Sequence, residues 1–137
     1  MGRPASGPGI AMAKVSRVGE LDVYRRLVEL HLQVHELSLT FPKFELYELG
    51  SQVRRSSNSA PANVAEGFNN KHKNIYLECI SRALGEIRET QHHLMIAARK
   101  GYLTKQTYEQ RVEAYNECSA MLRAIGRAID AKPRAVL

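Results

Sequence analysis

The sequence predicts an all-α fold, an antiparallel up-down-up-down four-helix bundle whose second helix is kinked near Pro61. Three observations support this prediction. Apolar residues recur at steps of three and four in four successive segments, no segment alternates apolar and polar residues as a half-buried strand does, and the connections are short. Short connections between amphipathic helices favour antiparallel neighbours.

The first helix is expected to run from Leu21 to Phe41. Its apolar positions form one seam of the kind that faces a bundle core: Val23, Leu27, Leu30, Val34, Leu37 and Phe41. Pro42 should end this helix, because a proline pushes the residue before it out of the helical region and has no N–H to donate.

The second helix is expected to start near Phe44 or Glu45. Its seam continues with side chains that become smaller along the helix: Leu46, Leu49, Val53, Ala60 and Val64. Small side chains allow a neighbouring backbone to approach closely. Pro61 removes one backbone hydrogen bond and should kink the helix without ending it. Gly67 is expected to end the helix in a left-handed conformation.

The third helix is expected to start with Asn74 as its cap and to end where two cations precede Gly101. Thr104 should cap a fourth helix, which Pro133 prevents from continuing. The seams of these two helices contain Tyr76, Ile80, Ile87 and Leu94, and then Tyr108, Val112, Tyr115, Leu122, Ile125 and Ile129.

Residues 20–130 therefore form the predicted bundle, between an N-terminal leader at 1–19 that we expect to be disordered and a C-terminal tail at 131–137. No apolar run approaches the roughly 20 residues that cross a bilayer, and the start of the chain lacks a secretory signal. We expect a cytoplasmic protein with no membrane partner. Cys79 and Cys118 lie on apolar helical segments and are expected to be packed thiols.

The positive charge of the chain lies partly in its tails. The formal net charge is +6, but residues 1–19 and 131–137 hold five basic and no acidic residues, which leaves 15 basic and 14 acidic residues between them. A basic surface must therefore come from local clusters. The candidate nucleic-acid-binding residues are Arg25, Arg26, Arg54, Arg55, Lys71, Lys73 and Arg82.

Arg54 and Arg55 are the best-placed of these candidates. They precede Ser56, Ser57 and Ser59, so that charge and hydroxyl donors share one stretch of helix, a combination suited to phosphate oxygens. A solvated or ion-paired arginine pair is the alternative interpretation.

The first helix carries a second apolar stripe beside its seam. The stripe contains Leu21, Tyr24, Val28, Leu32 and Leu39, and the last four are the candidate residues of an oligomer interface. An uncovered apolar stripe of this length is uncommon on a monomer, so we predict self-association ahead of binding to a different protein.

Metal chemistry receives little support from the histidines. His31 and His35 stand one turn apart, and Glu89 and His92 form a single Glu-x-x-His pair, whereas bundles with a carboxylate-bridged metal pair use two such pairs. We therefore predict no metal site and no cofactor, and a metal-dependent bundle enzyme is the weakest alternative.

Three glutamates, Glu66, Glu86 and Glu89, are the candidates for a general acid–base pair. Glutamates on helices are more often solvated or paired with arginine. The sequence also contains no Gly-rich phosphate loop, Cys-x-x-Cys pair or nucleophile elbow. We therefore predict that the protein is not an enzyme.

The run SQVRRSSNSAPANVAEGF at 51–68, with Phe41-Pro42 before it and GEIRETQ and KGYLT after it, carries a family resemblance. Over residues 21–130 the chain resembles the four-helix-bundle family encoded in intervening sequences of bacterial large-subunit (23S) ribosomal RNA genes. The most specific positions include Pro61, Asn63, Glu66 and Gly67, which we interpret as a structural motif.

The resemblance implies a ring-like homopentamer without enzymatic activity that binds nucleic acid. Similar bundles are the accessory (variability determinant) proteins of diversity-generating retroelements, which bind a reverse transcriptase and its RNA. An adaptor that binds a reverse transcriptase is therefore the alternative function. The chain departs from the pattern at Asn58 and Ala60, where larger apolar residues are expected, and at Arg82, where a small residue is expected.

Overall fold

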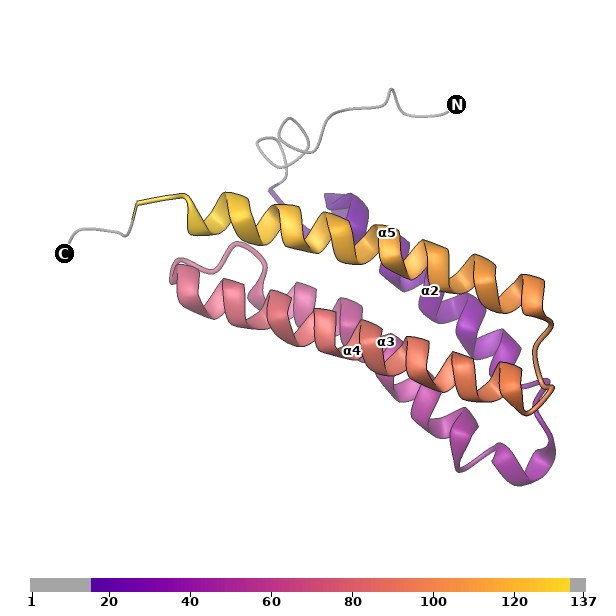
Figure 1. Cartoon of the computed structure of the whole chain (residues 1–137). Coiled ribbons are helices and arrows are strands. Elements are labelled where there is room, and N and C mark those ends of the chain that lie inside the picture. The colour runs from indigo at the N-terminus through magenta and orange to yellow at the C-terminus, as the bar shows by residue number, and fades with distance from the viewer. Residues whose placement is uncertain (1–15, 134–137) are drawn as a thin grey trace.

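The computed structural model describes residues 16–133 and contains four α-helices and two short 3₁₀ helices within them. The elements are η1 (Val18–Glu20), α2 (Asp22–Ser38), η2 (Lys43–Glu45), α3 (Leu49–Gly67), α4 (Lys73–Arg99) and α5 (Lys105–Asp130). Figure 1 shows the helices in two layers, with α4 and α5 in front of α2 and α3. The described part of the chain holds no strand, which confirms the predicted all-α bundle.

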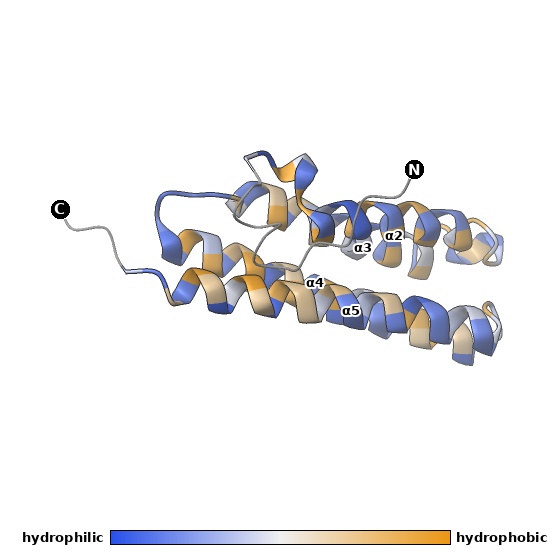
Figure 2. Ribbon diagram, turned by 90° about the horizontal axis from the view of Figure 1, so that it is seen from above, coloured by the Kyte–Doolittle hydropathy of each residue, from blue (hydrophilic) through white to orange (hydrophobic). Residues whose placement is uncertain are grey.

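The helical seams predicted from the sequence meet in one core. Each helix packs against its neighbours in the chain, and contacts between α2 and α5 close the bundle, while α3 and α4 share the most extensive interface. Figure 2 shows apolar positions distributed along every helix among polar ones, as a bundle requires. The fully buried core side chains include Val23, Leu27, Val34, Ala60, Ala83, Ile87, Leu94, Tyr115 and Leu122.

The predicted N-terminal leader lies mostly outside the described residues, as does the end of the C-terminal tail, at 134–137. The last part of the predicted N-terminal leader, however, is structured, because Val18–Glu20 forms η1 and the half-buried Val18 packs against the core. The ordered body therefore begins a few residues before the predicted boundary at residue 20. At the other end of the bundle, α5 ends at Asp130.

The connection between α2 and α3 is longer than predicted. The sequence indicated a first helix that reaches Phe41 and a second that starts near Phe44, but α2 ends at Ser38 and α3 begins at Leu49. In the last turn of α2, the hydroxyl of Ser38 donates to the carbonyl oxygen of His35 at 2.7 Å. This side-chain hydrogen bond satisfies a carbonyl at the end of the helix, which would otherwise need a backbone N–H from a further helical turn.

A buried carboxylate holds this connection in place. Glu45 is only 1% exposed, and its Oε2 accepts hydrogen bonds from Lys100 Nζ at 2.9 Å and Tyr102 Oη at 2.8 Å. The hydrogen bond from Lys100, followed by that from Tyr102, holds the pKa of Glu45 below its usual range. The chain at 43–48 therefore folds toward the end of α4 instead of continuing as helix.

Helix α3 runs without interruption through Pro61, which is buried. Nearby, Asn63 Nδ2 donates to the carbonyl oxygen of Ser59 at 2.8 Å, and Glu66 is exposed. The prediction of a left-handed Gly67 is wrong, because the left-handed residue of this turn is Asn69, with φ of 57°. Gly67 is required for a different reason, since a Cβ there would lie 2.4 Å from Cβ of Cys79 on α4.

The other helix ends follow the predictions more closely. Thr104 Oγ1 accepts a hydrogen bond from the backbone N–H of Thr107 at 3.1 Å, which confirms the predicted cap of α5. Gly101 adopts φ of 81° after α4, as its position after two cations indicated. Asn74 is not the cap of α4, because that helix starts at Lys73 and its cap residue, His72, makes no side-chain capping bond.

Both cysteines are buried and free, which confirms that they are packed thiols. Cys118 is 1% exposed, and burial raises the pKa of its thiol to about 11. Within residues 16–133, no helix is both long enough and apolar enough to cross a membrane.

We predict that Gly67→Ala destabilises the fold, because the new methyl group would also lie 2.8 Å from Sγ of Cys79 and force α3 away from α4. The free energy of unfolding should fall by about 1–3 kcal/mol, the usual cost of overpacking a core. A urea titration followed by far-UV circular dichroism measures it.

Gly85→Ala is the matched control, because a Cβ at Gly85 meets only Arg88 Nη2, at 3.9 Å. That variant should keep or gain stability by about 0.5–1 kcal/mol, the advantage of alanine over glycine inside a helix. Equal stabilities for the two variants would contradict the close packing of α3 on α4.

Candidate nucleic-acid interface

The seven predicted basic residues are spread along the bundle and do not form one cluster. Arg25 and Arg26 lie in the first turns of α2, Lys71 and Lys73 at the α3–α4 turn, and Arg82 in the first half of α4. The α3–α4 turn is at the end of the bundle that Figure 1 shows on the left, whereas Arg26 lies beside Glu117, near the middle of α5. Arg54 and Arg55 lie in the first half of α3, toward the opposite end.

Arg54 is a structural residue of the α2–α3 connection. Its Nη1 donates to Ser38 Oγ at 2.9 Å, and its Nη2 donates to the carbonyl oxygen of Leu46 at 2.6 Å. One guanidinium therefore ties the last turn of α2 and the irregular segment to α3. The side chain is only partly exposed, and its role as a phosphate ligand would compete with these bonds.

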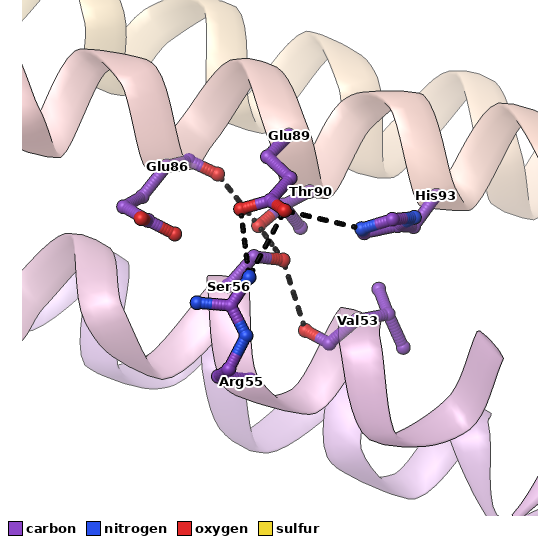
Figure 3. A network of polar contacts seen from close by, with 7 residues as sticks. All are labelled: Val53, Arg55, Ser56, Glu86, Glu89, Thr90 and His93. Carbon is purple, nitrogen blue, oxygen red and sulfur yellow. Dashed lines mark hydrogen bonds and ion pairs between the residues drawn. The ribbon is translucent and has the colours of Figure 1, made fainter. Parts of the chain in front are cut away.

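Arg55 faces α4 and pairs with Glu89. Its Nη2 donates to both carboxylate oxygens of Glu89, at 3.0 and 3.2 Å, and both side chains are accessible to solvent. Figure 3 shows this ion pair bridging α3 and α4. The alternative interpretation of Arg55, an ion-paired side chain, therefore describes this residue in the structure.

A buried hydroxyl pair lies beneath this ion pair. Thr90 Oγ1 donates to Ser56 Oγ at 2.8 Å or to the carbonyl oxygen of Glu86 at 2.9 Å, and Ser56 Oγ lies 3.4 Å from the carbonyl oxygen of Val53. Ser56 and Thr90 are both completely buried. Small hydroxyl side chains at this position allow α3 and α4 to approach closely while every hydroxyl keeps a partner.

Two titratable groups of the network lack a full set of partners. Glu86 has one buried carboxylate oxygen with no hydrogen-bond partner, and burial, followed by the neighbouring charge of Glu89, raises its pKa. His93 Nε2 lies 3.6 Å from Glu89 Oε1 without a hydrogen bond, and burial lowers the pKa of this imidazole. Both shifts favour the neutral side chains at this interface.

The predicted acid–base pair is therefore brought together only in part. Glu86 and Glu89 are neighbours in the network, but Glu66 is exposed near the other end of α3, where its charge acts on Cys79. His93, and not the predicted His92, is the histidine beside Glu89. In residues 16–133, no group of three or more His, Cys, Asp or Glu side chains is arranged to hold a metal ion.

The remaining predicted arginines form surface ion pairs. Arg25 pairs with Asp22 on the same helix, and the Nη1 of Arg26 lies 3.4 Å from the Oε2 of Glu117 on α5. Arg82 pairs with Glu78 at 2.7 Å and is exposed, so it adds charge to the surface and does not weaken a helix contact. Of the other departures from the family pattern, Asn58 is exposed and Ala60 is fully buried.

The two predicted lysines differ in environment. Lys71 is exposed in the α3–α4 turn. The Nζ of Lys73 donates to the carbonyl oxygens of Asp130 and Lys132, both at 2.9 Å, so this side chain caps the end of α5. The sequence assigned Lys132 only to the C-terminal tail, and its position beside Lys73 depends on the antiparallel pairing of α4 and α5.

The predicted oligomer stripe is exposed over only part of its length. Leu21 is buried in the core and Tyr24 and Val28 are half-buried, whereas Leu32 and Leu39 are 53% and 54% exposed. The structure adds Phe44 at 69%, Leu46 at 37% and Tyr47 at 86% exposure, all in the α2–α3 connection. Phe44 and Tyr47 lie off the predicted seam of the second helix. Leu46 was predicted to lie on that seam, but it is exposed because α3 begins only at Leu49.

The fold and this surface define a class of protein, a small four-helix bundle with a closed core, exposed apolar side chains and scattered surface cations. The chain belongs to the 23S rRNA-intervening sequence protein family, whose family model matches residues 19–124. This match confirms the resemblance seen in the motif at 51–68.

A solved structure shares the fold. It is the crystal structure of a protein with unknown function from the S23 ribosomal protein family of Bacteroides thetaiotaomicron, with a TM-score of 0.70 and 23% sequence identity. The similarity covers 77% of this chain and 95% of that one. No curated protein matches this chain.

We predict that Arg54→Ala and Arg55→Ala have different effects on stability. Loss of Arg54 leaves Ser38 and the carbonyl of Leu46 without a charged donor, so the free energy of unfolding should fall by about 1.5–3 kcal/mol. Loss of the solvent-accessible Arg55 should cost less than about 1 kcal/mol. Thermal or urea unfolding measures both values, and equal losses would contradict the structural role of Arg54.

Proposed function

We propose that this chain is a non-enzymatic, homo-oligomeric accessory protein that binds nucleic acid through basic side chains repeated around the assembly. The observation that carries the proposal is the location of its exposed apolar side chains. Of the six large ones in the described residues, five lie between residues 32 and 47: Leu32, Leu39, Phe44, Leu46 and Tyr47. A second copy of the chain that covers them removes this apolar surface from water.

Self-association gives the surface cations a common role. Arg26, Arg55 and Arg82 take part in ion pairs with exposed carboxylates, and such pairs contribute roughly 0–1 kcal/mol each. A nucleic-acid phosphate can therefore replace the carboxylate at small cost. One subunit offers few such positions, but a symmetric assembly such as the homopentamer implied by the resemblance repeats each of them.

The same apolar side chains favour a second candidate, a protein-binding adaptor. Phe44 and Tyr47 are exposed aromatic side chains, the type that most often anchors protein interfaces. In this case a different protein, such as the reverse transcriptase suggested by the resemblance, covers the α2–α3 connection, and the chain alone is monomeric.

We predict salt-dependent binding to RNA. In a fluorescence anisotropy titration with a single-stranded RNA oligonucleotide, the logarithm of the affinity should fall linearly as the logarithm of the salt concentration rises. The double variant Arg55→Ala and Arg82→Ala should bind more weakly and show a slope reduced by about 0.7 for each phosphate that it no longer neutralises. A single-stranded DNA of the same sequence separates RNA from DNA binding.

Lys105→Ala is the matched control, because Lys105 is a lysine at the start of α5 whose side chain is 88% exposed, and it was not a candidate residue. Its affinity and salt slope should match those of the wild type. Absence of binding at low salt, or a binding curve that responds neither to salt nor to the double variant, contradicts the proposal.

A further inference from the structure

A cavity of about 630 Å³ lies at the end of the bundle where the α3–α4 turn meets the end of α5. The α3–α4 turn and the end of α5 are on the left in Figure 1. Its volume lies within the range of roughly 300–1,000 Å³ that is typical of small-molecule sites. Its lining side chains include four that are basic or can become cationic: Lys71, His72, Lys73 and Lys132. Among the described residues that line this end cavity, none is acidic.

The charges of the end cavity are not all equally available. Lys73 is mostly buried, with 22% of its side chain exposed. Its Nζ donates to the carbonyl oxygens of Asp130 and Lys132 and lies 3.9 Å from Oδ1 of Asp130. Lys71 and Lys132 are exposed and have no carboxylate partner within the described part of the chain. Two ammonium groups among the lining side chains, one from the α3–α4 turn and one from the end of α5, are therefore available to an anion.

The walls of the end cavity are held in place without a ligand. Asn70 donates its backbone N–H to the carbonyl oxygen of Gly67 at 3.1 Å, and its Oδ1 accepts the backbone N–H of His72 at 2.8 Å. The ring of Tyr76 packs edge-on against Phe68, with centroids 6.2 Å apart. A ligand would therefore enter a site that is already ordered, which reduces the entropic cost of binding.

The remaining lining residues select the kind of anion. Ile129 and Pro133 provide an apolar wall, and the carboxamides of Asn69 and Asn74 provide both hydrogen-bond donors and acceptors. Cations, an apolar wall and carboxamides together match a ligand that has an anionic group and a flat polar ring. A bare inorganic anion would use only the lysines.

We propose that the end cavity binds a nucleotide, with its 5′-phosphate at Lys71 and Lys132 and its base against Ile129 and Pro133. This inference rests on the proposed nucleic-acid function and gives it a defined site. The nucleotide is either free or the 5′-terminal residue of a strand, since both present the same phosphate and base. The uncapped start of α4 adds a favourable dipole for the phosphate.

The test uses the full chain labelled with nitrogen-15 and two probes, uridine 5′-monophosphate and uridine. The monophosphate should shift the backbone amide resonances of residues 69–74 and 129–132, whereas uridine should shift them far less. Inorganic phosphate should bind more weakly than the monophosphate. Two short RNA strands that differ only in a 5′-phosphate or a 5′-hydroxyl distinguish a strand end from a free nucleotide.

The double variant Lys71→Gln and Lys132→Gln should bind the monophosphate about tenfold more weakly or worse, as expected for charge-assisted bonds to phosphate. Lys105→Gln should bind like the wild type. Circular dichroism establishes that both variants keep the fold, since neither lysine makes a side-chain bond in the described structure.

Three results overturn the inference: no shift at the end cavity with the monophosphate, equal shifts with inorganic phosphate, or an unchanged affinity in the double variant. These outcomes are separate from the proposed function. Salt-dependent RNA binding combined with any of these three results leaves the proposed function intact and removes this site. Monophosphate binding without any binding of longer RNA supports the end cavity and contradicts the proposed function.

Discussion

The close approach of α3 and α4 is the constraint on which the rest of the structure depends. Gly67 lies against Cys79 without room for a side-chain methyl, and the hydroxyls of Ser56 and Thr90 meet in the fully buried part of the interface. Because these residues are small, the two helices pack closely along their length. The same approach brings Arg55 to Glu89 and sets the turn that forms one wall of the end cavity.

The closed core has a consequence for the surface. Each helix uses one seam to complete the bundle, so the second stripe of α2 and the apolar side chains of the α2–α3 connection stay in contact with water. Because the core is complete within one chain, these exposed apolar side chains remain free to contact another protein. In the proposed assembly, that surface joins subunits, and the weakly paired arginines and free lysines of each copy act together on a phosphate chain.

The fold could be predicted from the sequence because seam spacing, Thr104 and Gly101 are local signals that do not depend on distant residues. The α2–α3 connection could not, since it depends on Glu45 reaching Lys100 and Tyr102, which are distant in sequence and follow the end of α4. For the candidate site, the sequence predicted which residue types take part but not which partners each side chain contacts. Spacing identified Arg54 and Arg55 as a pair, but only the tertiary structure separates an arginine bonded to the backbone from one that faces solvent.

The oligomeric state tests the central claim most directly. Covering of the exposed apolar side chains and repetition of the basic side chains both require that several copies of the chain associate. The measurement is the mass of the full-length protein by native mass spectrometry over a range of concentrations. The account predicts an assembly whose mass is a whole-number multiple of the 15.4 kDa chain, five chains if the family resemblance extends to assembly. A single 15.4 kDa species at every concentration would contradict it.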